Sequence, residues 1–319
     1  MEIPTSSENT KSKNSENTLK EYAEHIAKAA PRLLWHYTSA EGLLGILEQG
    51  ALRATGVDYL NDKTEGTYLT EMMLGKIKNK VPKNEFQIFK YIFSPHCRRV
   101  REMGVVCFCG SDDLLSIWRA YTSGKGFAIG FDSKKLARYW VEEKHEGLLS
   151  PVKYSESKAL ELAEHHATVV VDAWRSLLPQ GMKEFSSFNK NLKEPLDEDV
   201  EKLAQILPEF FKKTGYLMMS GAFQKNKHFH EEREWRLVTS LLGGRELDRP
   251  RIETSVNKNG LSLFRPIPFQ DTPQDTPIRE IMMGPGLDEY SQKKAIFFTL
   301  QNLGYPTIKI SNSGVPIRL

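Results

Sequence analysis

Cysteine is scarce in this chain, which has only Cys97, Cys107 and Cys109. Three thiols cannot build a disulfide framework, so small disulfide-stabilised secreted folds are excluded, and an odd number suits a reducing compartment. Long apolar runs are also missing. No stretch approaches the roughly 18 apolar residues of a membrane-spanning helix, and the N-terminus lacks the basic and apolar segments of a signal peptide. We therefore expect a cytoplasmic protein with no membrane partner.

Neither sign of charge dominates the composition. Lys and Arg total 44 against 41 for Asp and Glu, which gives a formal net charge of +3. This balance excludes a basic footprint over the whole chain of the kind that nucleic-acid-binding proteins carry, but it leaves a local basic patch open. With 319 residues, of which 39% are hydrophobic, the chain can bury a large core as one domain or as two.

Signatures of several familiar chemistries are missing as well. The two cysteines at 107–109 have the wrong spacing for a usual zinc pair, and the histidine pairs at 165–166 and 228–230 have no second pair of ligands close by in the sequence. The glycine-rich turn at 123–126 is too short for a phosphate-binding loop. No G-x-S-x-G motif of a serine hydrolase occurs. We therefore expect no metal cofactor.

Composition predicts a tail and one domain that contains an insertion. Residues 1–17 have almost nothing to bury, so they predict a disordered tail, and residues 18–319 predict a single α+β domain. Within this domain, residues 155–213 are charged and carry Leu and Ala at helical spacing, which predicts a helical insertion.

Apolar periodicity and turn residues predict the elements of the domain. The expected strands cover residues 33–37, 105–109, 127–131, 152–154, 232–240, 278–284 and 307–310. The expected helices cover residues 19–30, 38–50, 114–121 and 287–303. Thr38 and Glu41 match a capping box at the start of the second helix, and Gly50 suits its C-terminal cap. Residues 111–113 are the expected cap of the third helix.

Two carboxylates and a guanidinium are grouped at the start of one expected strand. Since side chains alternate along a strand, Glu232, Glu234 and Arg236 share one face, while Trp235 on the other face indicates that the strand is anchored in a core. The charged face suits either a solvated sheet edge or the polar wall of a pocket.

His36 lies at the end of a strand, directly before a helix N-terminus. Backbone amides and the helix dipole at such a position favour a phosphate or another anion, so His36 is a candidate ligand-binding residue. A partly buried histidine with a purely structural role is equally compatible with the pattern.

Two further groups of residues are ambiguous. Asn61, Asp62 and Glu65 either line a pocket or form a turn that caps the following helix. Trp118 and Tyr121 are three apart on one helix face, a spacing that suits a core stripe or a stacking platform for a planar ring.

Taken together, these motifs resemble a bacterial family, domain of unknown function number 2971, over roughly residues 33–318. In chain order they are Trp35-His36-Tyr37-Thr38-Ser39, Leu60-Asn61-Asp62 with Glu65, Cys107-Phe108, Trp118-x-x-Tyr121, Gly124-Lys125-Gly126-Phe127, Gly130-Phe131-Asp132, Lys225, Glu232-x-Glu234-Trp235-Arg236 and the segment 281–284. Membership of this family implies no activity.

The opening His36-Tyr37-Thr38, followed by a helix of the form G-L-L-x-I-L-x-x-G, resembles more distantly the ADP-ribosyltransferase superfamily. This resemblance implies a mixed, largely antiparallel central sheet of ADP-ribosyltransferase-like type with flanking helices. It also implies that His36 bonds the adenosine ribose, that Tyr121 stacks on nicotinamide and that Glu234 holds the other ribose.

The same resemblance suggests roles for the remaining motif residues. Glu232 would position the acceptor nucleophile, and Arg236 would pair with a pyrophosphate or with Glu234. Further cofactor contacts are expected from Tyr37, Thr38 and Trp118, and further pocket residues are Asn61, Asp62, Glu65 and Lys225.

The leading functional hypothesis is therefore ADP-ribosyl transfer or cleavage with NAD as substrate, in a toxin or an effector of anti-phage defence. A rival hypothesis is a non-catalytic sensor of nucleotides or nucleic acid that uses the same pocket. A third is a protein-interaction module in which residues 155–213 contact a partner, such as a second copy of the chain. The macromolecular acceptor, protein or nucleic acid, stays open.

Overall fold

The computed structural model describes most of the chain, in several stretches. They are residues 11–60, 68–93, 103–144, 147–177, 197–241, 252–257 and 260–316. Within these stretches no helix combines the length and the apolar content that crossing a bilayer requires.

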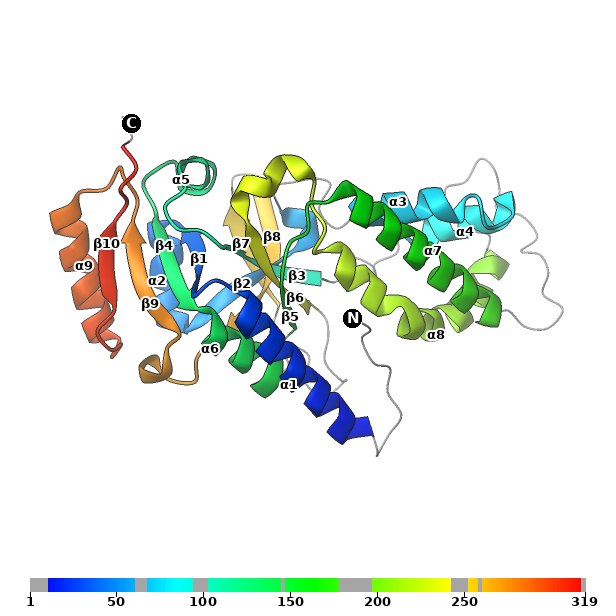
Figure 1. The fold of residues 1–319 in the computed structure, drawn as a ribbon, viewed down its shortest axis with the longest axis horizontal. Coiled ribbons are helices and arrows are strands. Elements are labelled where there is room, and N and C mark those ends of the chain that lie inside the picture. Colours follow the sequence, from blue (N-terminus) through cyan, green and yellow to red (C-terminus); the bar gives the residue numbers. More distant parts are fainter. Residues whose placement is uncertain are drawn as a thin grey trace.

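A large twisted sheet forms the centre of the molecule (Figure 1). Its strands are β1 (Leu33–Thr38), β2 (Ala51–Gly56), β3 (Met103–Cys109), β4 (Phe127–Asp132), β5 (Leu148–Pro151), β6 (Glu234–Ser240), β7 (Glu253–Asn257), β8 (Gly260–Pro268), β9 (Ile278–Met283) and β10 (Lys309–Asn312). Their order is β10-β9-β4-β1-β3-β2-β8-β7, and β6 joins β3 to β5. Only β9 and β10 pair in parallel among these strands. The expected α+β fold with a largely antiparallel sheet is confirmed.

The sheet is interrupted along one edge of β3. β1 pairs with β3 only through Trp35 and Cys109, whereas β2 pairs with the other end of β3 through Thr55 and Gly56. The opposite edge of β3 pairs with β6 along its whole length. Neither β1 nor β2 is in register with Cys107 in the described pairing, so the strands separate there and leave room for side chains.

Helices cover both faces of this sheet. They are α1 (Lys11–Ala29), α2 (Ala40–Gln49), α5 (Leu115–Thr122), α6 (Ser133–Ala137) with the π-helical turn η3 (Arg138–Glu143), and α9 (Glu289–Asn302). Buried residues of α1, α2, α6, η3 and α9 share one core with the sheet, whereas Ile117 and Trp118 of α5 pack on the other face. Burial of these apolar side chains is the main force that holds the layers together.

Four more helices form a unit of their own beside the sheet, on the right of Figure 1. This helical unit comprises α3 (Tyr68–Ile77), α4 (Lys83–Ile92), α7 (Glu156–Leu177) and α8 (Asp197–Gly221). Phe89, Trp174 and Phe210 are fully buried at its centre. Helices α7 and α8 occupy much of the segment in which the sequence predicts an insertion, and α3 and α4 reach the same unit from the β2–β3 connection.

The N-terminal helix is longer than expected. It begins at Lys11, inside the segment for which the sequence predicts a disordered tail. Residues 1–10 lie outside the described residues.

Two helix caps differ from the expected ones. The N-cap of α2 is Ser39, whose hydroxyl accepts from Gly42 N at 3.1 Å, because Thr38 stays extended as the last residue of β1. No side chain caps α5, which starts one residue beyond Leu114. Asp113 instead accepts from the Trp118 indole at 2.8 Å and from Gly314 N at 2.6 Å, so it connects α5 to the C-terminal segment.

The strand expected at 152–154 is displaced toward the N-terminus. β5 ends at Pro151, and Lys153 forms only an isolated bridge to Gln224. Val152 N still donates to Glu234 O at 2.8 Å, after which the chain turns to the segment that follows α8.

The C-terminal part follows the expected strand-helix-strand order. α9 starts after Asp288, whose carboxylate accepts from Ser291 N at 2.9 Å, and β10 then returns beside β9.

Candidate functional site

A small cavity opens where β1 separates from β3, beside the first residues of β6. Its volume is ≈ 100 Å³. The residues that line it are Trp35, His36, Tyr37, Cys107, Phe108, Cys109, Ile117, Tyr121, Glu232 and Glu234. The structure therefore brings together an imidazole, two carboxylates and aromatic rings that are distant in sequence.

Strand β6 starts at Glu234, so Glu232 is not on the strand as the sequence predicts. It ends the 3₁₀ helix η4 (Lys227–Glu232), and Arg233, with φ 43°, turns the chain into the strand. The Asn226 side chain caps η4 by accepting from His228 N at 3.1 Å, which stabilises helical turns in place of an extended start. Glu232 and Glu234 nevertheless face the same point.

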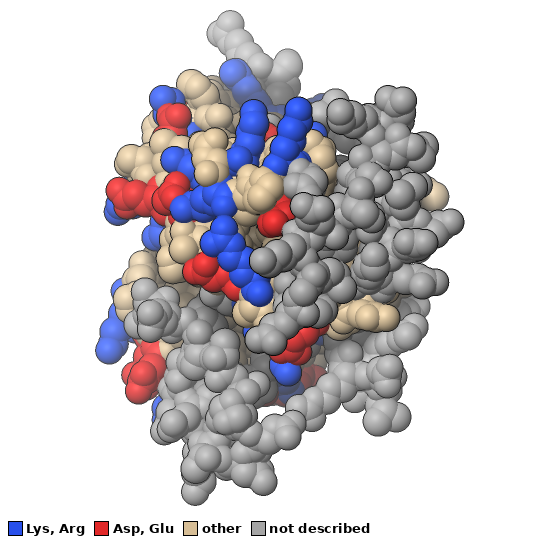
Figure 2. Space-filling model, turned by 90° about the vertical axis from the view of Figure 1, so that its right-hand side faces the viewer, with Lys and Arg blue, Asp and Glu red and all other residues tan. Residues whose placement is uncertain are grey.

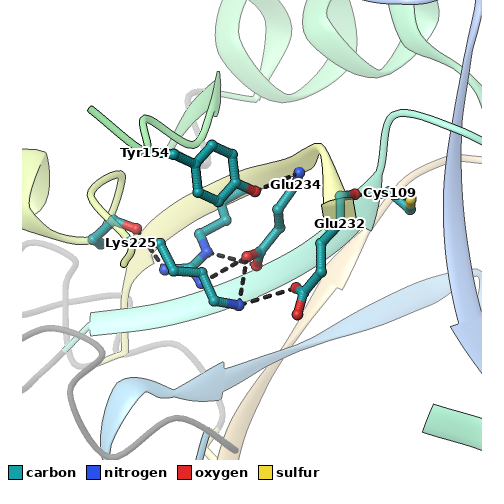
Figure 3. Close-up of polar contacts among 7 residues, drawn as sticks. Cys109, Tyr154, Lys225, Glu232 and Glu234 are labelled. Carbon is teal, nitrogen blue, oxygen red and sulfur yellow. Dashed lines mark hydrogen bonds and ion pairs between the residues drawn. The ribbon is translucent and has the colours of Figure 1, made fainter. Parts of the chain in front are cut away.

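That point is the ammonium group of Lys225. Figure 3 shows both carboxylates directed toward it. Lys225 Nζ lies 3.0 Å from Glu232 Oε2 and 3.0 Å from Glu234 Oε2. Arg236 binds Glu234 through two hydrogen bonds, from Nε at 2.7 Å and from Nη2 at 2.9 Å, and its Nη1 donates to Ala222 O at 2.7 Å. The alternative of a solvated edge is excluded, since Glu234 and Arg236 are buried.

The two carboxylates differ in how far they can reach a ligand. The Glu234 side chain is 5% exposed and that of Glu232 is 18% exposed. Burial acts to raise the pKa of the Glu234 carboxyl, but the charge and hydrogen bonds of Arg236, together with Lys225, outweigh burial and hold this pKa below its usual value. Glu234 is thus ionised and committed to internal partners, and Glu232 is the more accessible acid.

His36 bridges the gap in the sheet with its side chain. Its Nδ1 lies 2.9 Å from Cys107 O, at the position where neither β1 nor β2 pairs with β3. Because a carbonyl oxygen only accepts, Nδ1 carries the proton and Nε2 has the free electron pair. Burial lowers the pKa of His36, and the hydrogen bond to Cys107 offsets this only in part, so the imidazole is neutral at pH 7.

The expected aromatic residues have different surroundings. Tyr37 and Tyr121 line the cavity, and Tyr121 is 42% exposed at its mouth. Trp118 is fully buried and does not line the cavity. Its ring contacts that of Tyr37 edge to face, with ring centres 4.8 Å apart. Thr38 lies against the first turn of α2, where its hydroxyl occupies the space that a side chain at Gly42 would need.

Several residues of the site are not among the expected site residues. Tyr154 fixes the start of β6, because its hydroxyl accepts from Glu234 N at 2.9 Å. Cys109 donates from its thiol to Glu232 O at 2.9 Å. Burial raises the pKa of Cys109 to about 11, so the thiol stays protonated and is a poor nucleophile at neutral pH. The alternating pattern of β3 contains both Cys107 and Cys109, but nothing in it indicates that they face a cavity.

Three expected pocket residues, Asn61, Asp62 and Glu65, lie outside the described residues. Within the part of the chain that is described, no group of three or more His, Cys, Asp or Glu side chains is placed to hold a metal ion.

The fold and the cavity define an α+β protein with a compact polar site at a break in its central sheet. Residues 117–237 match a family model described as "Protein of unknown function (DUF2971)", which supports the resemblance to that family. The matched stretch includes Tyr121, Lys225, Glu232 and Glu234, but not His36. No curated protein matches the chain.

Proposed function

We propose that the cavity binds NAD and that the protein breaks the bond between nicotinamide and ribose. The ADP-ribose passes to water or to a macromolecular acceptor. One observation carries the proposal: His36, Tyr121 and Glu232 line the same cavity.

The lining of the cavity suits the nicotinamide ring of NAD, which is planar and positively charged. Tyr37, Phe108 and Tyr121 offer aromatic surfaces that attract a cation through their ring quadrupoles, and Glu232 adds a partly exposed carboxylate. The volume of ≈ 100 Å³ is well below the roughly 300–1,000 Å³ of a pocket for a drug-sized ligand. A single ring therefore enters, while the ribose and the rest of the dinucleotide lie at the mouth.

The reaction needs no oxidant or reductant. The bond between ribose C1′ and the nicotinamide nitrogen breaks, its electron pair leaves with neutral nicotinamide, and the ribose develops positive charge as in glycoside cleavage. A water oxygen, or a hydroxyl or amine of an acceptor, then bonds to C1′ and loses one proton to solvent. A carboxylate bonded to a ribose hydroxyl stabilises this state more strongly than the ground state and so accelerates the step.

Glu232 is the better candidate for that carboxylate. The resemblance to transferases implies this role for Glu234, but both Glu234 oxygens bind Arg236 and one of them also binds Lys225. Glu234 and Lys225 instead position Glu232, since the Lys225 ammonium group contacts both acids. Neutral His36, with an electron pair on Nε2, can accept a hydrogen bond from a ribose hydroxyl of the adenosine.

Nicotinamide release from NAD by the purified chain tests the proposal, with water or a crude mixture of proteins and nucleic acids as acceptor. We expect turnover by the wild type and a loss of about 100-fold or more in Glu232→Gln, the usual effect of removing one group that stabilises transition-state charge. Glu231→Gln is the matched control, because Glu231 is exposed and is not among the residues that line the cavity. Absence of both nicotinamide release and NAD binding would refute the proposal.

A second candidate function is NAD or nucleotide binding without catalysis. The ion pairs of Glu234 favour it, because they fit a residue that stabilises the fold. In that case NAD binds to the wild type and to Glu232→Gln with similar affinity, and neither protein releases nicotinamide.

A further inference from the structure

One end of the helical unit is rich in positive charge. Lys76, Lys78, Lys80 and Lys83 follow one another across the connection between α3 and α4, with no acidic residue between them. Figure 2 views the molecule from the side of this unit and shows Lys and Arg side chains gathered on the described part of that face.

Two neighbouring helices add cations to the same place. Arg175 of α7 donates from Nη2 to Lys80 O at 3.1 Å. Lys213 of α8 donates from Nζ at 3.0 Å to Oγ of Ser176, which is the residue after Arg175 in the sequence. These two residues and the four lysines are called the basic surface below.

One carboxylate partly neutralises the basic surface. Glu164 of α7 lies 2.7 Å from Lys80 Nζ and 3.5 Å from Lys76 Nζ. This glutamate is about half exposed, and surface ion pairs of this kind are worth about 0–1 kcal/mol, so they compete weakly with an external anion. Among the described residues, no ion pair holds Lys78, Lys83, Arg175 or Lys213. Glu85, Asp172 and Glu209 lie within four residues of these cations in the sequence and form no ion pair with them among the described residues. The six cations of the basic surface thus outnumber the four neighbouring carboxylates, although the chain as a whole is nearly neutral.

The side chains around the positive charge indicate which anionic partner the surface fits, a membrane or a nucleic acid. A helix surface that enters a membrane interface combines basic residues with exposed large apolar ones. The exposed large apolar residues of the described chain include none at 76–83, at 175 or at 212–213. We propose that the basic surface binds the phosphate backbone of a nucleic acid. This binding is independent of NAD and goes beyond the function proposed for the cavity.

Fluorescence anisotropy with the full chain and a labelled DNA duplex or RNA hairpin, over a range of salt concentrations, tests the proposal. Phosphate contacts release counterions, so we expect the logarithm of affinity to fall linearly with the logarithm of salt concentration. The double variant Lys78→Glu with Lys83→Glu should bind at least about tenfold more weakly at low salt, and the magnitude of its salt slope should fall by about two.

The matched control makes the same change in net charge on the sheet side. Lys134 of α6 and Lys294 of α9 are exposed and have no ion pair among the described residues, and Lys134→Glu with Lys294→Glu should retain wild-type affinity. Equal weakening by the two double variants would overturn the proposal, because it would indicate a general charge effect. Binding to anionic phosphatidylserine vesicles but not to either nucleic acid would also overturn it.

Discussion

Lys225 Nζ lies 3.0 Å from Glu234 Oε2, and both side chains are about 95% buried. Removing Lys225 leaves two carboxylates, Glu232 and Glu234, with one cation, Arg236, and an uncompensated charge in a buried ion pair typically costs about 3–5 kcal/mol. We expect Lys225→Met to lower the free energy of unfolding by roughly 3 kcal/mol and to abolish nicotinamide release, because Glu232 loses the same partner. Chemical denaturation measures the first effect.

The control for this variant is Lys227→Met. Lys227 is mostly exposed and pairs with Glu156 at 3.6 Å, so its removal should change stability by less than about 0.5 kcal/mol. A Lys225→Met protein as stable as this control would contradict the role given to the ion pair.

The His36 side chain performs two separable tasks. Nδ1 holds Cys107 O, and Nε2 is the atom assigned to the ligand. His36→Ala loses both and should be less stable by about 1–3 kcal/mol, the cost of a buried unpaired acceptor. His36→Asn places an amide N–H near the position of Nδ1, so it should recover most of the stability but not the affinity for NAD. Denaturation and calorimetry of both variants separate the tasks, and recovery of affinity by His36→Asn would exclude a role for Nε2.

Tyr121 is expected to act through its ring. Contacts between an aromatic ring and a cationic or aromatic ligand group are worth about 0.5–1.5 kcal/mol, so Tyr121→Ala should weaken NAD binding by up to about tenfold, and Tyr121→Phe should not. Tyr290→Ala, at a site 79% exposed on α9, is the control. If Tyr121→Ala binds NAD with wild-type affinity, the nicotinamide ring does not contact Tyr121.

A histidine in the helical unit predicts how stability depends on pH. Burial, followed by the charge of His165, lowers the pKa of His166 to about 4. Below pH 6.5 the unfolded chain binds a proton that the folded chain does not bind until about pH 4, so stability is complete above pH 6.5 and falls in that window.

The loss due to His166 should be about 2–3 kcal/mol. His166→Gln, whose side-chain amide can still donate to Ser220 Oγ, should remove that part of the decline. Denaturation between pH 4 and pH 7 measures the decline in both proteins, and identical declines would show that His166 is not its source.

The sequence was sufficient to predict the elements whose own residues carry a regular apolar pattern. Strands β1, β3 and β4 and helix α2 have apolar residues at regular spacing and clear stop signals such as Gly50, so their positions were predicted to within about two residues. The start of β6 at Glu234 was not predicted, because Glu232, Glu234 and Arg236 would also alternate regularly along one longer extended strand. The left-handed turn at Arg233 depends on bonds to distant residues, such as that between Gly110 N and Arg233 O at 2.9 Å.

Contacts between segments that are distant in the sequence account for the other differences between the expected and the observed structure. Helices α3 and α4 share one apolar core with α7 and α8, and no local sequence pattern indicates that partnership. Trp118 has the same spacing to Tyr121 whether it stacks on a ligand or supports Tyr37, and only the tertiary fold decides between the two. The meeting of His36 with Glu232 and Glu234 depends on how β1, β3 and β6 are ordered in the sheet.

The position of NAD on the protein is the most direct test of the proposed function. A crystal structure of Glu232→Gln grown with NAD should place the nicotinamide ring in the cavity beside Tyr121. A ribose hydroxyl should lie within about 3.2 Å of the side chain at position 232, as a hydrogen bond requires. A dinucleotide bound away from the break between β1 and β3, with this cavity empty, would contradict the account.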